Sequence, residues 1–396
     1  MTDADSLKSR VDEVVEELAD ELWALALRIH ANPELAYKEE KAAAWLTEFL
    51  EQRGCRVERG VGGLATAFRA EVRGAGPGPT VAVLAEYDAL PAIGHACGHN
   101  VIATSAAGAG AAAAALAGAA GLPFPGRIVV VGTPAEEGGA GKVRLLDAGG
   151  FADVDAAMMI HPLCRTRLWR PSLGLTKVKV EYSGKAAHAS AAPWRGVNAL
   201  NAVIALFNAL DAMRQQVRPD SRLHGIITVG GQQANIIPEY TAAEFYLRSP
   251  DKAYLGELRR RFEAAAAGAA TQTGCRVVVT FDPVIHDPVR PNMVMVDLFG
   301  RNLERLAFPV DPDDTGGYGS TDAGNVSQAL PMIHPYIRIA PDDTPNHSRD
   351  FTEAAASPMA RAGMLVAAKA LAMTALDLLA DPARLAAARA EFAQGG

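Results

Sequence analysis

The sequence of 396 residues has few aromatic residues, few cysteines and no excess of basic charge. Aromatic side chains make up 6% of the chain and charged side chains 21%, whereas hydrophobic residues make up 49%. That balance is typical of a folded globular protein rather than a disordered one. Lys and Arg number 38 against 45 Asp and Glu, which gives a formal net charge of -7. Nucleic-acid-binding proteins need a basic face, so the composition argues against a nucleic-acid partner.

The four cysteines, Cys55, Cys97, Cys164 and Cys275, are scattered without the regular spacing of a disulfide framework. Their spacing favours reduced thiols in a cytoplasmic protein. The N-terminal segment is acidic and amphipathic, and it lacks the basic start and apolar core of a signal peptide. We therefore expect no signal peptide in this sequence.

Long, strongly hydrophobic runs are also missing. The longest uncharged run, residues 101–126, consists mainly of Ala and Gly, with two prolines near its end. It is too weakly apolar to span a bilayer convincingly, so we expect a tightly packed buried helix and no membrane partner.

Apolar segments of strand length alternate with expected helices in the first part of the chain. Residues 80–85, 127–132 and 156–160 are such segments, and each ends in a polar turn. This alternation predicts a mostly parallel α/β sheet flanked by helices. Ligands bind at the carboxyl ends of the strands in sheets of this type, so the polar turns are candidate site positions.

The pattern changes near Leu173. Residues 175–183 alternate apolar and polar side chains, as a half-exposed antiparallel strand does. The expected elements that follow complete a β-α-β-β-α-β order, which is the ferredoxin-like arrangement. We therefore predict an inserted α+β domain of residues 175–290. The α/β domain is then built from residues 1–174 and 291–396.

Three potential metal ligands, His95, Cys97 and His99, lie close together after the strand 80–85, with Asp88 just upstream. Soft and borderline ligands crowded into a strand-to-helix turn suggest a metal site. The cluster alone is ambiguous, because cysteine is often a small buried hydrophobe and a lone histidine is more often a structural hydrogen-bonding group.

Further potential ligands occur at three other strand ends or loops. Glu136 and Glu137 follow the strand 127–132, His161 follows the strand 156–160, and His347 lies in a polar loop before the last long helix. Each has an ordinary alternative: a solvated turn for the glutamates, a turn residue for His161, and a helix cap for His347. Together the positions predict a metal site in which one of the two adjacent glutamates stays free as a general base.

Five motifs follow one another in the chain: YDALPAIGHACGHN, GTPAEEGGAGK, IHP, GSTDAGNVS and TPNHS. This set resembles the zinc-dependent metallo-exopeptidase and aminoacylase family over nearly the whole chain. The amidohydrolase branch is the most similar, with its p-aminobenzoyl-glutamate hydrolase, β-alanyl-lysine-type dipeptidases, hippurate hydrolase and auxin-conjugate hydrolases. The resemblance implies a zinc-exopeptidase-like α/β domain, an inserted lid and dimerisation domain, and hence a homodimer. It also implies a hydrolase that cleaves the amide bond of small N-acyl amino acids or dipeptides.

By this resemblance, two divalent metal ions are bound and Glu136 is the general base. Five ligands suit two ions with one shared ligand better than a single tetrahedral zinc, and Cys97 is the favoured shared ligand. Other branches have Asp at this position, and a thiolate favours softer metals, so we expect Zn²⁺ first and Mn²⁺ second. His95 lies outside the ligand pattern and is expected to order the loop. The implied metal ligands are Cys97, His99, Glu137, His161 and His347.

The resemblance also implies substrate groups in and near the inserted domain. His188 matches a lid histidine that reaches the partner subunit's active site, and Asn235 matches a residue that supports the oxyanion. Arg248 either clamps a substrate carboxylate or is a surface charge at a strand end. Gly319 and Ser320 either line the substrate pocket or form a tight turn.

Two other functions compete with hydrolysis. A non-catalytic, metal-binding relative with a binding or regulatory role is disfavoured, because such a protein would be free to lose Glu136 and the ligand set. An oxidoreductase that binds a dinucleotide would need a glycine fingerprint at its first strand-to-helix turn, and the sequence has none there.

Overall fold

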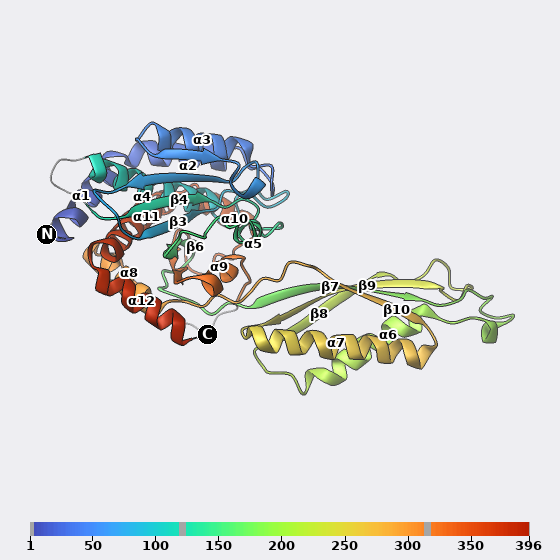
Figure 1. The fold of residues 1–396 in the computed structure, drawn as a ribbon. Helices are drawn as coiled ribbons and strands as arrows, with labels where there is room; N and C mark the ends of the chain where they lie inside the picture. The colour runs from blue at the N-terminus through green and yellow to red at the C-terminus, as the bar shows by residue number, and fades with distance from the viewer. Residues whose placement is uncertain (1–3, 119–123, 313–317, 396) are drawn as a thin grey trace. The chain divides into compact units, whose positions relative to one another are not determined.

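The computed structural model describes residues 4–118, 124–312 and 318–395, which form two compact units (Figure 1). The second unit consists of residues 171–288 and 318–324, and the first unit contains the other described residues. The Gly-rich segment 318–324 therefore packs with the second unit, whereas the sequence-based boundaries place it in the α/β domain.

A six-stranded sheet in the order β1-β2-β4-β3-β5-β11 forms the centre of the first unit. The pairs β3–β4, β3–β5 and β5–β11 are parallel, whereas β1–β2 and β2–β4 are antiparallel. The predicted α/β fold class is confirmed, and the antiparallel edge makes the sheet mixed. The strands are β1 (Arg56–Arg59), β2 (Phe68–Arg73), β3 (Thr80–Ala85), β4 (Arg127–Gly132), β5 (Ala156–Met158) and β11 (Met332–Ile333).

Two long apolar helices make up much of the core. Helix α4 (His99–Gly118) packs against β2, β3 and β4, and α11 (Pro358–Ala380) packs against α4 and β3. Both are long and apolar enough to cross a membrane, but 78% and 89% of their apolar windows are buried within the protein. They are core helices of the first unit. The sequence singled out only residues 101–126 as a membrane candidate, and 119–123 of these lie outside the described residues. Helix α11 is the last long helix expected from the sequence, although it was not considered as a membrane candidate.

Residues 6–30 have an apolar periodicity that predicts one helix, but they form two. Helices α1 (Ala4–Glu17) and α2 (Ala19–His30) meet at Leu18, whose ψ of 0° departs from helical values. The first unit also contains α3 (Glu40–Glu51), η1 (Val61–Gly63), α5 (Gly141–Asp147), α8 (Met293–Arg305), α10 (Arg349–Ala354) and α12 (Pro382–Gln394). Helix α9 (Ala323–Ala329) begins in the second unit and ends in the first. A separate parallel pair joins β6 (His161–Leu163) to β12 (Tyr336–Arg338).

The second unit has the predicted ferredoxin-like arrangement. Its antiparallel sheet has the order β10-β7-β9-β8, and α6 and α7 cover one face of that sheet (Figure 1). Phe245 and Phe262 lie in the core between the sheet and the helices. The elements are β7 (Gly174–Ser183), η2 (Pro193–Arg195), α6 (Ala199–Arg214), β8 (Arg222–Val229), β9 (Tyr240–Ser249), α7 (Lys252–Thr273) and β10 (Arg276–Phe281).

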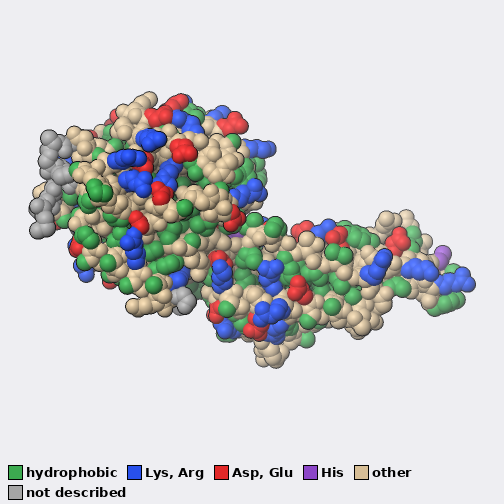
Figure 2. All heavy atoms as spheres, viewed as in Figure 1, with side chains coloured by type: hydrophobic (Ala, Val, Ile, Leu, Met, Phe, Trp, Pro, Cys, Tyr) green, Lys and Arg blue, Asp and Glu red, His purple; other side chains and the backbone are tan. Residues whose placement is uncertain are grey.

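Figure 2 shows basic and acidic side chains close to one another over the face of the first unit that it draws. The second unit presents several apolar side chains at its surface. Ile226 is 65% exposed on the edge strand β8, and Trp194 is 77% exposed on η2. Exposed apolar side chains together with an unpaired strand edge form a surface suited to contact with another protein chain.

Candidate metal centre

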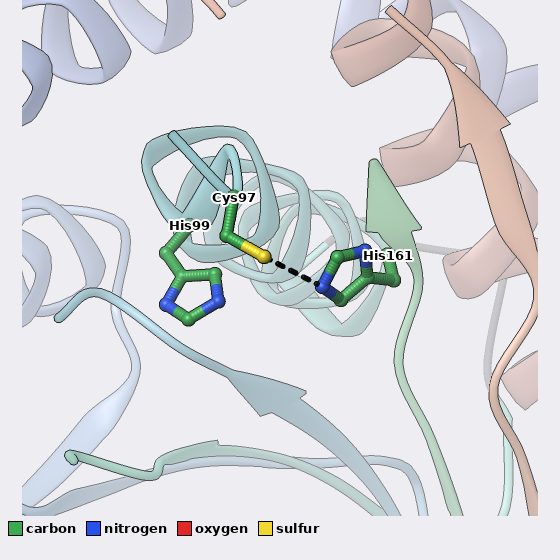
Figure 3. Close-up of side chains that lie close together, drawn as sticks. All are labelled: Cys97, His99 and His161. Carbon is green, nitrogen blue, oxygen red and sulfur yellow. Dashed lines mark hydrogen bonds between the residues drawn. The ribbon is translucent and has the colours of Figure 1, made fainter. Parts of the chain in front are cut away.

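The turn between β3 and α4 brings Cys97 and His99 to the N-terminal end of α4, and both side chains are buried. Figure 3 shows the Cys97 and His161 side chains pointing toward each other, with His99 beside Cys97. The Cys97 Sγ lies 3.4 Å from the His161 Nε2. His161 begins β6, just past the carboxyl end of β5, and β5 pairs in parallel with β3. Residues far apart in the chain therefore converge at the carboxyl ends of neighbouring strands.

Gly98, between the two residues of this turn, has a φ of +73°, a conformation that costs other residues about 1–2 kcal/mol. A Cβ on Gly98 would also lie 2.8 Å from the Pro162 Cγ. We expect Gly98→Ala to lower the free energy of unfolding of the metal-free protein by about 2–4 kcal/mol and to weaken metal binding. Urea denaturation and metal analysis measure the two effects.

Gly60→Ala is a matched control, because Gly60 also has a φ of +73° but has no heavy atom within 4 Å of an added Cβ. It should show only the backbone cost of about 1–2 kcal/mol and keep its metal. Equal destabilisation by the two substitutions would show that the contact with Pro162 does not constrain the turn.

Glu137 and His347 complete the cluster from two further loops. The His347 Nε2 lies 3.4 Å from the Cys97 Sγ and 3.6 Å from the Glu137 Oε1. The His347 backbone N–H donates to the Ala96 carbonyl oxygen at 2.9 Å, which ties this loop to the turn that carries Cys97. His347 has a φ of 61°, which is uncommon outside glycine but is found more often in histidine than in most residues.

In each of two groups of three residues, the potential ligand atoms lie within 4.8 Å of one another, and the two groups share only the Cys97 Sγ. The first group is Cys97, His99 and His161, and the second is Cys97, Glu137 and His347. A thiolate, imidazoles and a carboxylate form a donor set that suits Zn²⁺, and two such groups with one shared atom fit a pair of ions.

Unpartnered buried atoms support the same interpretation. Among the described residues, the buried His99 Nε2 and Glu137 Oε1 have no hydrogen-bond partner. They lie 3.9 Å from each other. Buried polar atoms of native proteins are nearly always paired, so these atoms are arranged for a ligand such as a cation.

Asp88 orients two of the candidate ligands. Its Oδ1 lies 2.9 Å from the His99 Nδ1, and its Oδ2 accepts the Glu137 backbone N–H at 2.9 Å. Metal-binding histidines usually donate their second ring N–H to a carboxylate or a carbonyl oxygen, which directs the other nitrogen at the metal. The His161 Nδ1 contacts the Pro162 carbonyl oxygen at 2.8 Å in the same way. The sequence reading noted Asp88 only as a neighbour, although its position just after β3 places it at the ligand-binding edge.

A buried ion pair beside the cluster was missed by the sequence reading. Glu86 and Lys142 are both fully buried and form a salt bridge, and the Glu86 Oε2 lies 3.4 Å from the His99 Nε2. Burial opposes ionisation of Glu86, but the charge of Lys142, with those of His99 and His161, lowers its pKa to about 2. A glutamate directly after a fully apolar strand was the available sequence clue, because charges at such positions are nearly always paired.

Burial raises the pKa of the Cys97 thiol to about 12. Burial also lowers the pKa of His99, but the Asp88 carboxylate outweighs it and holds that pKa well above its usual value. Burial and the neighbouring His334 lower the pKa of His161 to about 3. At neutral pH the metal-free centre therefore holds a protonated Cys97 thiol and a positively charged His99, whereas His161 is a neutral imidazole.

Metal binding should release those two protons, because ligands bind metal in their deprotonated forms. We expect release of about two protons per chain near neutral pH, so the overall metal affinity rises with pH by about two orders of magnitude per unit. Calorimetry of Zn²⁺ binding in buffers of different ionisation enthalpy measures this number. Metal affinity that does not change with pH around neutrality would contradict the assignment.

The predicted base Glu136 lies in the first unit, in a group with His99 and Glu137. The remaining predicted site residues lie in the second unit, in two groups. Arg248 donates from its Nη1 to the Ser320 Oγ at 3.0 Å, and Gly319 precedes Ser320. His188 and Asn235 are exposed, and the Ala189 N–H donates to the Asn235 carbonyl oxygen at 2.9 Å. The structure thus brings Arg248 together with Ser320, and His188 near Asn235, and their substrate roles stay predictions.

His95 belongs to none of the ligand groups. It stacks with His30 at 6.1 Å between ring centroids, and burial lowers its pKa to about 3.

The chain is similar to known peptidases and amidohydrolases over nearly its whole length. A family model described as a peptidase dimerisation domain matches residues 172–273. The Xaa-Arg dipeptidase of Mus musculus is 42% identical over 397 residues, which cover 98% of this chain and 92% of that protein. A p-aminobenzoyl-glutamate hydrolase chain of Escherichia coli (strain K12) is 27% identical, over 97% of this chain and 94% of that protein.

The fold is also that of solved structures. One is a Bacillus subtilis protein described as a dinuclear metal binding peptidase from the M20 family, with a TM-score of 0.73 and 19% identity. The match covers 92% of this chain and 99% of that one. The two proteins therefore share both the α/β unit and the inserted unit.

Proposed function

The chain belongs to the M20 family of metallopeptidases, and we propose that it hydrolyses the amide bond of dipeptides or other N-acyl amino acids with two bound divalent metal ions. The observation that carries this proposal is the convergence of two ligand groups on the shared Cys97 Sγ, with Glu136 next to one of the ligands. The ligands in this proposal are Cys97, His99, Glu137, His161 and His347.

Bound divalent ions would lower the pKa of a water molecule and polarise the amide carbonyl group. Glu136 would act as the general base that accepts a proton from the attacking water and passes it to the leaving amine. Glu136 is half-buried and lies in a group with His99 and Glu137 but in neither group that shares Cys97, so we assign it to proton transfer rather than to metal binding. Asp88 would keep His99 and the Glu137 backbone in place during the reaction.

The substrate would be bound by residues of the second unit. Arg248 presents a guanidinium group that can bind a substrate carboxylate through two hydrogen bonds, and Ser320 already orients one of its nitrogens. Gly319, beside Ser320, is exposed and leaves open space where a side chain would be. His188 would act in the partner subunit's active site, and Asn235 would support the oxyanion.

Dipeptides with a basic C-terminal residue are the first substrates to test, because the relative at 42% identity is named an Xaa-Arg dipeptidase. We expect release of free amino acid from alanyl-arginine and β-alanyl-lysine. The comparison set is β-alanyl-histidine, hippurate and p-aminobenzoyl-glutamate, and chromatography of the products measures all five. Turnover should disappear on chelation and return with Zn²⁺ or, second, with Mn²⁺. Hydrolysis of none of these compounds by metal-loaded protein would favour a non-catalytic binding or regulatory role.

We also propose a homodimer formed through the second unit and a cytoplasmic location. The match to a peptidase dimerisation domain and the exposed apolar side chains near the β8 edge support the dimer. Light scattering that gives the mass of one chain would contradict it.

The four cysteines are all unpaired, which suits a reducing compartment. Recovery of the protein outside the cytoplasmic fraction of cells would contradict the location.

A further inference from the structure

The loop that carries Glu136 and Glu137 is held by a buried carboxylate from a distant segment. Glu39, just before α3, is fully buried. Its Oε1 accepts the backbone N–H groups of Tyr37 at 2.8 Å and Ala135 at 2.9 Å. Its Oε2 accepts the Thr66 hydroxyl at 2.8 Å. Both carboxylate oxygens are thus occupied by donors from three separate parts of the chain.

The loop is held at further points on either side of Glu136. Ala135 has a φ of 63°, a conformation that alanine adopts only when its surroundings enforce it. The Glu137 N–H donates to Asp88, and the Tyr37 hydroxyl donates to the Gly139 carbonyl oxygen. Glu136 therefore lies between two backbone amides that are each bound by a carboxylate from another segment. This arrangement fixes the direction in which the Glu136 side chain leaves the loop.

Burial of the Glu39 carboxylate is unfavourable, so ordinary packing does not explain its position. Within the described part of the chain, no Lys, Arg or His nitrogen lies within 4.0 Å of its carboxylate, unlike that of Glu86. Burial raises its pKa, which reflects the cost of holding a charge there. Its hydrogen bonds offset that cost, so the group is best explained by the backbone that it holds.

We propose that Glu39 is a positioning residue, which fixes the left-handed conformation of Ala135 and thereby aims Glu136 at the reacting water. This inference rests on the proposed role of Glu136 as the general base. Displacement of a catalytic group by about 1 Å can lower the rate by about 100-fold, so a hydrogen bond that fixes the position of the base can have a large effect on the rate.

Glu39→Asp and Glu39→Gln test the proposal. The aspartate keeps the charge but is one methylene shorter, so it withdraws from the Ala135 N–H. The glutamine keeps the length, its carbonyl oxygen can accept both N–H groups, and its amide can donate to the Thr66 hydroxyl. For Glu39→Asp we expect kcat to fall by about 10- to 100-fold with KM within about twofold of wild type and two metal ions retained. Glu39→Gln should keep kcat within about threefold of wild type.

Amide hydrogen exchange gives a readout that does not depend on turnover. In the metal-free protein, peptides that cover residues 133–139 should exchange faster in Glu39→Asp than in Glu39→Gln or wild type. Asp155→Ala is the matched control, since Asp155 accepts the Thr80 N–H at 2.7 Å at the opposite end of β3. It should lose stability but keep kcat and the exchange of residues 133–139.

Different results separate the two proposals. If the wild-type protein hydrolyses none of the substrates, the proposed function is wrong. The comparison of hydrogen exchange would then decide by itself whether Glu39 holds the loop. Full kcat and unchanged exchange in Glu39→Asp would overturn the inference, as would equal loss of kcat in Glu39→Gln. An equal fall in kcat in Asp155→Ala would also overturn it, because general destabilisation would explain the effect.

Discussion

Glu136→Gln is expected to lower kcat by about 10²- to 10⁴-fold while the protein keeps two metal ions per chain. The glutamine has nearly the same shape as glutamate but cannot accept and return the proton of the attacking water. Glu136 lies in a group with His99 and Glu137, and neither of the groups that share Cys97 contains it. Its replacement should therefore separate the chemistry from metal binding. Steady-state kinetics and metal analysis of the same preparation measure both quantities.

Two controls sharpen this experiment. Glu58→Gln makes the same change on β1 at an exposed position and should leave kcat unaltered. Glu137→Gln should instead lose metal, because Glu137 belongs to the group with Cys97 and His347. If Glu136→Gln keeps wild-type kcat, another group is the base. If it loses metal as Glu137→Gln does, Glu136 is a ligand.

Four of the five candidate ligands could be predicted from the sequence because each of them follows an apolar strand. Cys97, His99, Glu137 and His161 could be found in this way, since parallel strands present their carboxyl ends at one edge of the sheet. The spacing of residues along a chain does not say which side chains touch across the site. The sequence therefore only favoured Cys97 as a shared ligand, whereas the atomic distances place its Sγ in both ligand groups.

The residues that hold the ligands were harder to predict. Asp88 and Glu39 act through backbone N–H groups of Glu137 and Ala135, and nearly any residue type has such a group, so no side-chain motif marks the partner. For the Glu86–Lys142 pair, the only clue in the sequence was a charged residue directly after an apolar strand. Hydrophobic periodicity predicts one helix over residues 6–30 where the structure has two, because the two helices keep nearly the same apolar face across Leu18.

Cys97→Ala is expected to reduce the affinity for both metal ions by more than about 100-fold and to leave under about 1% of wild-type turnover. Loss of a residue that only orients a ligand already costs about 10- to 100-fold in metal affinity, and the Cys97 Sγ is the atom common to both groups. Cys55→Ala is the matched control. Cys55 is also buried, and burial raises its pKa to about 11, but it belongs to no ligand group among the described residues.

Cys97→Asp tests what the sulfur atom contributes to metal binding and to the choice of metal. A carboxylate can bridge two ions, so this variant should regain metal that Cys97→Ala has lost. Oxygen ligands favour harder ions, so the ratio of Mn²⁺-supported to Zn²⁺-supported turnover should rise relative to wild type. The side chains are of similar length and the site is buried, so a change in this ratio reports ligand chemistry rather than access. An unchanged ratio in a fully loaded Cys97→Asp protein would mean that the imidazole and carboxylate ligands set the metal preference. If Cys97→Ala still holds two ions as tightly as wild type, the thiolate does not join them.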